Sequence, residues 1–117
     1  MFQTYDEDFW KAIDTLVASG KIIIDRPKGS VHPRYPQIEY ALDYGYLEKT
    51  ASMDGDGIDV WCGSLSEVRA NAVICTVDLI KKDSEIKILI GCTEKEMGVV
   101  YEFHNRTEFM KGILIKR

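Results

Sequence analysis

The segment from Ala51 to Trp61 constrains this 117-residue chain more than any other, because it crowds three carboxylates into six positions. In an extended chain, residues two apart point to the same face, so Asp54 and Asp56 can converge on one point. The two intervening glycines let the backbone bend and bring Asp59 to the same side. Clustered carboxylates repel one another, and a hard cation such as Mg²⁺ relieves that repulsion. The segment therefore predicts a metal site.

The same segment is also compatible with an ordinary acidic turn between two strands, where Asp and Gly are common. A calcium-binding EF-hand loop is excluded by position. Its obligatory glycine would fall on Asp59 and its closing glutamate on Leu65.

Length and composition limit the classes of protein open to the chain. Its 117 residues, 45% of them hydrophobic, predict one globular domain over residues 1–117. The net charge of -4 argues against a nucleic-acid partner. We expect no membrane partner and a cytoplasmic location, because no segment reads as a membrane span or a signal peptide. Three distant cysteines indicate neither a zinc site nor a disulfide framework.

Periodicity predicts a helix at each end of a series of short strands. Helix 6–19 carries an apolar stripe that includes Phe9 and Trp10, which is a packing face or, in part, an oligomer contact. A capping box from Thr93 to Glu96 starts a second helix, to about His104. Alternating apolar residues and turn signals predict strands at 21–25, 39–47, 58–62, 72–80, 85–92 and 109–115. These elements predict an α+β fold, with helix 1–20 followed by a small, mostly antiparallel barrel and the late helix in 21–117.

A stiff, basic loop follows the first strand. Arg26 directly precedes Pro27, and Lys28, His32 and Arg34 lie between Pro27 and Pro36. Any one of these residues fits an ordinary solvated loop. Together they favour an oxyanion partner, because Arg forks onto phosphate and Lys supplies a point charge.

In order, the chain presents Pro27-Lys28-Gly29-Ser30, Tyr44-Gly45-Tyr46, the Asp54-to-Asp59 block and Asp83-Ser84-Glu85-Ile86-Lys87. This order resembles the soluble family I inorganic pyrophosphatases, from about Ile22 to the C-terminus. The resemblance implies an OB-like five-stranded barrel, hydrolysis of pyrophosphate or another phosphoanhydride, and a homo-oligomer. It also implies Mg²⁺ as cofactor, with Mn²⁺ as a substitute.

The resemblance assigns roles residue by residue. Asp56 would be the catalytic base, and Tyr44 would act beside it on the phosphates. The remaining assignments are metal binding by Asp54, Asp59, Asp83 and Glu85, and substrate binding by Lys28, Arg34, Arg26 and Lys87.

The chain also departs from the family pattern. Pro36 to Tyr40 is too short for the usual hairpin, and Gly57 replaces a proline. His104, Asn105 and Arg106 stand where the family has a Tyr-Lys phosphate clamp. Two alternatives therefore stay open: the same chemistry on a larger nucleotide or phosphometabolite, and a non-catalytic module that binds metal–phosphate or nucleotide.

Overall fold

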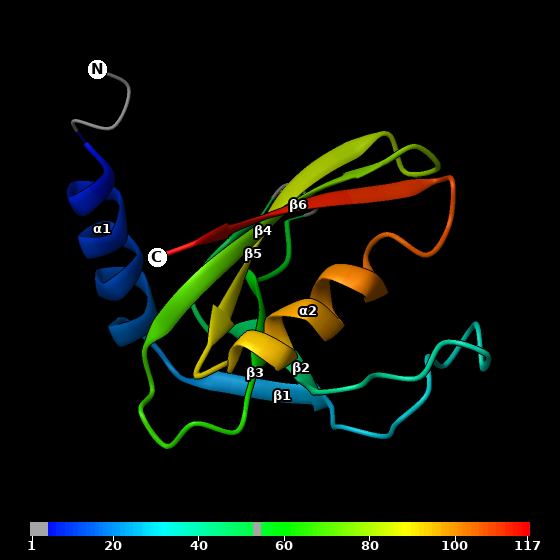
Figure 1. Cartoon of the computed structure of the whole chain (residues 1–117), viewed down its shortest axis with the longest axis horizontal. Coiled ribbons are helices and arrows are strands. Elements are labelled where there is room, and N and C mark those ends of the chain that lie inside the picture. Colours follow the sequence, from blue (N-terminus) through cyan, green and yellow to red (C-terminus); the bar gives the residue numbers. More distant parts are fainter. Residues whose placement is uncertain (1–4, 53–54) are drawn as a thin grey trace.

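A mixed sheet of six strands organises the fold, with a helix packed on each face (Figure 1). The computed structural model describes residues 5–52 and 55–117. The elements along the chain are α1 (Asp6–Ala18), β1 (Ile22–Arg26), β2 (Asp43–Leu47), β3 (Asp59–Cys62), β4 (Ala70–Asp78), β5 (Asp83–Ile90), α2 (Glu94–Phe103) and β6 (Met110–Lys116). Neither described helix is long and apolar enough to cross a membrane.

The α+β class is confirmed, but the five-stranded barrel is wrong. The strands follow the order β1-β2-β3-β5-β4-β6, and every neighbouring pair is antiparallel except β3 and β5, which run parallel. Within the described residues no pairing joins β1 to β6, so the sheet stays open. Strands β1 and β3 have only five and four residues. Strands this short offer few ladder positions over which to build the tilt and stagger that closure requires.

Helix α1 covers one face of the sheet. Its Trp10 and Ile13 are buried against Val60, Val73 and Ile88, as the apolar stripe predicts. Three acidic residues in its first turn interact favourably with the positive end of the helix dipole, and its last turn has no basic residue.

Helix α2 covers the opposite face. The Thr93 hydroxyl accepts a hydrogen bond from the Glu96 amide, and the Glu96 carboxylate accepts one from the Thr93 amide, so the predicted capping box is present. Met97 and Val100 of the helix pack with Trp61 in the core of this face.

The strand predicted over residues 39–47 begins only at Asp43. Tyr40 instead pairs with the basic loop: its amide donates to the Ser30 carbonyl, and its carbonyl accepts from the Gly29 amide. Gly45 allows the backbone of β2 to lie very close to that of β1, as a glycine within a strand indicates. A Cβ at Gly45 would lie 1.8 Å from the Ile23 carbonyl oxygen.

The β4–β5 hairpin turns two residues earlier than predicted. Strand β4 ends at Asp78 and β5 begins at Asp83. One carboxylate oxygen of Asp78 accepts hydrogen bonds from the amides of Ile80 and Lys81, at 2.9 and 3.0 Å. The short side chain of Asp78 therefore starts the turn, in the manner common for Asp.

Candidate active site

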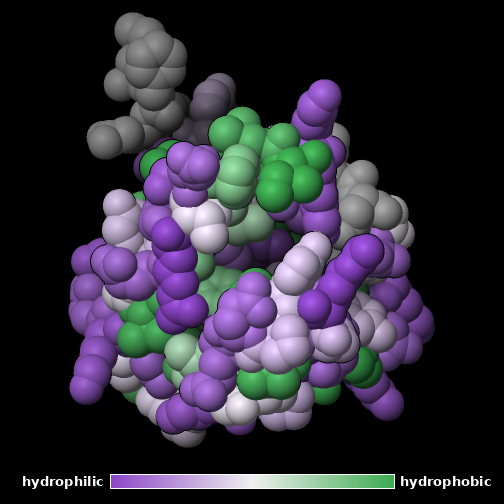
Figure 2. All heavy atoms as spheres, turned by 90° about the vertical axis from the view of Figure 1, so that its right-hand side faces the viewer, coloured by the Kyte–Doolittle hydropathy of each residue, from purple (hydrophilic) through white to green (hydrophobic). Residues whose placement is uncertain are grey.

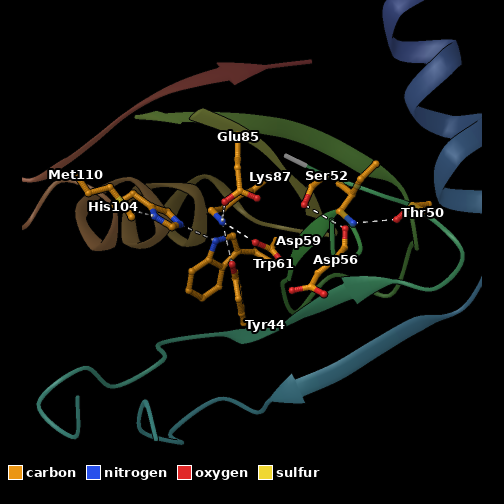
Figure 3. A network of polar contacts seen from close by, with 11 residues as sticks. Tyr44, Thr50, Ser52, Asp56, Asp59, Trp61, Glu85, Lys87, His104 and Met110 are labelled. Carbon is orange, nitrogen blue, oxygen red and sulfur yellow. Dashed lines mark hydrogen bonds and ion pairs between the residues drawn. The ribbon is translucent and has the colours of Figure 1, made fainter. Parts of the chain in front are cut away.

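Three neighbouring strands bring the central site residues together. Tyr44 comes from β2, Asp59 from β3, and Glu85 and Lys87 from β5 (Figure 3). The Lys87 ammonium donates hydrogen bonds to Asp59 Oδ2 at 2.7 Å and to the Tyr44 hydroxyl at 3.0 Å. Its Nζ also lies 3.7 Å from Glu85 Oε1. The side chain of Lys87 is only 7% exposed, so these contacts compensate a buried charge.

Burial and the neighbouring Asp59 carboxylate raise the pKa of Tyr44 well above its ordinary value. The phenol therefore keeps its proton at neutral pH. Tyr44 can orient a bound oxyanion by hydrogen bonding, but it cannot serve as a base. This leaves the carboxylates as the proton acceptors of the site.

The acidic turn is held by backbone hydrogen bonds. The Ser52 amide donates to the Asp56 carbonyl at 2.7 Å, and the Gly55 amide donates to the Ser52 carbonyl at 3.0 Å. Gly55 has φ +85°, a left-handed conformation that side chains disfavour. The exposed Asp56 follows Gly55 in this turn, and in the view of Figure 3 its carboxylate points towards the side of Tyr44. This position fits a group that takes a proton from water.

The structure describes three of the four predicted metal ligands: Asp59, Asp83 and Glu85. Asp54 lies outside the described residues. Among the residues described, no three His, Cys, Asp or Glu side chains gather closely enough to hold a metal ion. Carboxylate oxygens from Asp59 and Glu85 are still the hard ligands that suit Mg²⁺. The donor set fits the ion in its chemistry, and Lys87 supplies the positive charge between these two carboxylates.

Asp83 and Asp78 extend the acidic edge of the site along the hairpin. Asp83, Glu85 and Lys87 alternate along β5 and therefore share one face. Asp78 lies directly opposite Asp83 across the β4–β5 pair. Sequence reasoning missed Asp78, because its position opposite Asp83 depends on where the turn begins.

Of the predicted substrate-binding residues of the loop, Lys28 and Arg34 are exposed and Arg26 is partly buried. Arg26 lies opposite Tyr44 in the β1–β2 pair, just after a β-bulge. The backbone amide of the exposed Lys28 donates a hydrogen bond to Asp43 Oδ1 at 2.8 Å. The exposed Arg34 donates its amide to Nδ1 of His32 at 3.0 Å. The face of the molecule in Figure 2 is hollowed at its centre, with hydrophilic residues on either side of the hollow and a hydrophobic group above it.

Positively charged residues of the loop and of the β4–β5 turn act on the same histidine, His32. Burial lowers the pKa of His32, and so do the charges of Arg26, Lys81 and Arg34. Lys81 belongs to the β4–β5 turn, whereas the two arginines flank the loop. His32 therefore feels positive charges from two segments that are distant in the sequence.

A buried aromatic group lies behind Tyr44. The Tyr44 and Trp61 ring centroids are 4.5 Å apart, and the Trp61 indole donates a hydrogen bond to Nε2 of His104 at 3.0 Å. Since Nε2 accepts, the proton of the neutral imidazole lies on Nδ1, which is 3.4 Å from the Met110 sulfur. His104 is thus a structural support for the site.

Asn105 and Arg106, whose roles the sequence leaves open, also have structural partners. The Asn105 side-chain amide donates to the Gly112 carbonyl, and its oxygen accepts from the Gly112 amide. This covers part of the exposed edge of β6. The Arg106 guanidinium lies 5.3 Å from the centroid of the Phe103 ring.

The buried His104 predicts an acid-sensitive fold. Burial, with a smaller contribution from Lys87, lowers the pKa of His104 to about 3, whereas an unfolded histidine titrates near 6.5. Between these values the unfolded state binds more protons, so the free energy of unfolding falls as pH drops from about 6.5 towards about 3. We expect a slope of up to about 1.4 kcal/mol per pH unit.

Urea unfolding across this pH range measures the effect. His104→Gln keeps an acceptor for the Trp61 indole but cannot titrate, so its curve should lack this part of the slope. Equal slopes for the two proteins would contradict a neutral, buried His104.

Comparison with known proteins identifies the fold. No family model and no curated protein matches the sequence. Among solved structures, the inorganic pyrophosphatase of Coxiella burnetii matches with a TM-score of 0.60 at 16% identity, over 80% of this chain and 86% of that one. The chain has the inorganic pyrophosphatase fold.

Two further solved pyrophosphatases give the same result. The Neisseria gonorrhoeae enzyme has a TM-score of 0.58 at 18% identity, over 83% of this chain and 75% of that one. The Helicobacter pylori enzyme has a TM-score of 0.59 at 12% identity, over 82% and 83%. The resemblance read from the motifs is therefore confirmed as a pyrophosphatase-like fold. At this identity the likeness concerns the fold, and the chemistry rests on the site residues.

Proposed function

We propose that this protein is a hydrolase of phosphoanhydrides, with inorganic pyrophosphate as its leading substrate. The observation that carries the proposal is Lys87, a buried cation held by Asp59 and Tyr44 next to the acidic turn. Such an arrangement stabilises negative charge that develops on a phosphate, because a fixed cation acts strongly where water is excluded. The pyrophosphatase fold of the neighbours supports the same reaction class.

In the proposed reaction, Asp56 takes the proton from the attacking water; its exposed carboxylate on the side of Tyr44 supports this role. Lys87 and Tyr44 hold the phosphate that faces the strands. Arg26, Lys28 and Arg34 neutralise the other phosphate.

We also propose Mg²⁺ as the cofactor, with Mn²⁺ as a substitute, held by Asp54, Asp59, Asp83 and Glu85. When bound, the metal would lower the pKa of the attacking water and offset charge on the phosphates. We propose further that residues 1–117 act as one domain in the cytoplasm, as part of a homo-oligomer, without nucleic acid or membrane as partner.

A second candidate is the same chemistry on a nucleotide or another phosphometabolite. The charges of Arg26, Arg34 and Lys81 favour this alternative, because all three act on His32 and together could bind the further phosphates of a longer chain. The third candidate, a regulatory module that binds without turnover, would keep the cations and lack hydrolysis.

A phosphate-release assay tests all three. We expect Mg²⁺-dependent release from pyrophosphate, and slower release from tripolyphosphate and ATP. Arg34→Ala should slow the hydrolysis of tripolyphosphate more than that of pyrophosphate. Lys95 is an exposed lysine of α2, and Lys95→Ala should change neither rate. Faster turnover of ATP would favour the second candidate. Release from no substrate, with phosphate still bound in calorimetry, would establish the binding module instead.

A further inference from the structure

A groove of about 870 Å³ opens on the sheet face beneath α1, between the helix and strands β4, β5 and β6. Helix α1 covers this face around Val73 and Ile88 and leaves the end near the β4–β5 hairpin uncovered. The helix lines the groove with one stripe of residues: Phe9, Ala12, Ile13 and Leu16. Their spacing of three, four and seven positions is that of a single helix face. The groove therefore has a helix as its wall and a sheet as its floor.

The floor of the groove is largely apolar. Three large side chains from three strands, Val77, Ile86 and Ile113, are 50%, 46% and 64% exposed. They gather because Cys75 lies opposite both Ile86 and Ile113, and Val77 follows two positions later on the same face. Pockets for small ligands are mostly apolar and have volumes of about 300 to 1,000 Å³. The volume and the lining of this groove therefore fit one small, mostly apolar molecule.

One positively charged side chain belongs to the groove. The exposed Lys111 lies opposite Val77 on the α1 side of the sheet, and its Nζ donates a hydrogen bond to the Asn105 carbonyl at 3.3 Å. Within the described residues Lys111 forms no ion pair. Glu85 also lines the groove, but it alternates with the apolar residues of β5, and its carboxylate lies 3.7 Å from the Lys87 ammonium. Lys111 therefore offers its charge to a ligand, whereas Glu85 is paired on the opposite face.

The charged end of the groove is its hairpin end. Ser84, Val77 and Lys111 form one row across β5, β4 and β6, and the hairpin lies away from α1 (Figure 1). The other end lies under α1, where Ile13 and Ile88 are buried. From Ser84 to Ile88 the floor extends over four strand residues, or about 13 Å. A ligand that fits both ends carries an anionic head beside Lys111 and a hydrocarbon chain that runs towards Ile88.

We propose that this groove binds a small amphiphile with one hydrocarbon chain and an anionic head group such as a carboxylate. Burial of the chain removes apolar surface of both the ligand and the groove from water, which supplies the affinity. The head pairs with Lys111, and a charge-assisted hydrogen bond of this kind is about twice as strong as a neutral one. A neutral or cationic head would leave the ammonium unpaired beside an apolar ligand. The groove and the candidate active site lie on opposite faces of the sheet, so the inference does not depend on the proposed function.

Isothermal titration calorimetry with dodecanoate, kept below its micelle concentration, tests the proposal. We expect saturable binding at one site. Dodecyltrimethylammonium, which has the same chain length and a positive head, should bind about tenfold more weakly. Lys111→Glu should reverse this preference, whereas Lys95→Glu, which changes an exposed lysine of α2, should keep it. A wild type that does not bind dodecanoate would overturn the proposal, and so would equal affinities for the two head groups.

A pair of alanine substitutions tests where the chain binds. Ala12 and Ala18 are both exposed residues of α1, and of the two it is Ala12 that lines the groove. Ala12→Trp should weaken dodecanoate binding by about tenfold or more, because the indole occupies volume that the chain needs. Ala18→Trp should bind dodecanoate as the wild type does. Circular dichroism checks that both variants keep their helices. Equal affinities for the two variants would place the amphiphile elsewhere and contradict the proposal.

Cysteine alkylation tests the site in the wild-type protein, so the result does not depend on the folding of a variant. Cys75 lies on the floor of the groove and is partly exposed, whereas the partly exposed Cys62 of β3 is not among the residues that line it. Dodecanoate should slow the alkylation of Cys75 and leave that of Cys62 unchanged. Protection of both cysteines, or of neither, would count against binding in the groove.

Two controls address other occupants of the same face. Alkylation of Cys75 without amphiphile should be independent of protein concentration, because a small ligand leaves the face open until it binds. A rate that falls as the protein concentration rises would assign the face to a protein partner instead. Cosedimentation with phosphatidylcholine vesicles, without binding of monomeric dodecanoate, would assign it to a lipid surface. Either result would overturn the proposal.

Discussion

Replacing Asp56 with asparagine should lower turnover by about two to four orders of magnitude, the usual contribution of a positioned general base. Asparagine keeps the size and one acceptor oxygen but cannot take up a proton at neutral pH. The turn should survive, because the Ser52 amide and hydroxyl donate to the Asp56 carbonyl, which asparagine keeps. Metal and phosphate affinity should therefore be close to those of the wild type.

Phosphate release and calorimetric metal binding are measured together for this variant. Asp59→Asn is the informative comparison, because it should lose metal affinity and turnover at once. Glu108→Gln, an exposed carboxylate in the loop before β6, should change neither quantity. Full activity of Asp56→Asn would show that another group accepts the proton.

Replacing Lys87 with methionine should lower the free energy of unfolding by about 3 kcal/mol, the low end of the range for breaking a buried ion pair. Methionine keeps most of the apolar stem but removes the cation. Asp59 and Glu85, whose side chains are 22% and 9% exposed, then lose the charge that compensates them. Urea unfolding at neutral pH gives the value.

Lys116→Met is the matched control, because Lys116 forms an ion pair with Glu94 at 2.8 Å on the surface. Exposed pairs contribute about 1 kcal/mol or less, so this variant should lose little. Mg²⁺ should reduce the deficit of Lys87→Met if it binds the same carboxylates. Equal losses for the two lysine variants would mean that the buried pair contributes no more to stability than an exposed one.

Local sequence patterns predicted a helix or strand well where its formation depends only on the residues of that segment. The helix of Trp10 and Ile13 and the capping box of Thr93 need only the periodicity and caps of their own residues. Errors arose where a distant segment decides the outcome. Tyr40 leaves its predicted strand because the Gly29–Ser30 backbone supplies its hydrogen-bond partners.

The barrel prediction failed for a related reason. Alternation along a strand shows that the strand exists, but not which strand it joins. The three isoleucines at the start of β1 suggested burial on both faces, yet all three are only partly buried. Among the described strands, β1 lies at the edge of the sheet and pairs with β2 alone.

The sequence by itself determined which chemical groups the site can use. The spacing of the acidic turn and the alternation of Asp83, Glu85 and Lys87 follow from the geometry of turns and strands. Only the tertiary structure decided which of them meet. Asp59 reaches Lys87 because β3 and β5 pair in parallel, and Trp61 reaches His104 across 43 residues. Such contacts depend on strand order and on burial shared by distant segments, and no local pattern specifies these.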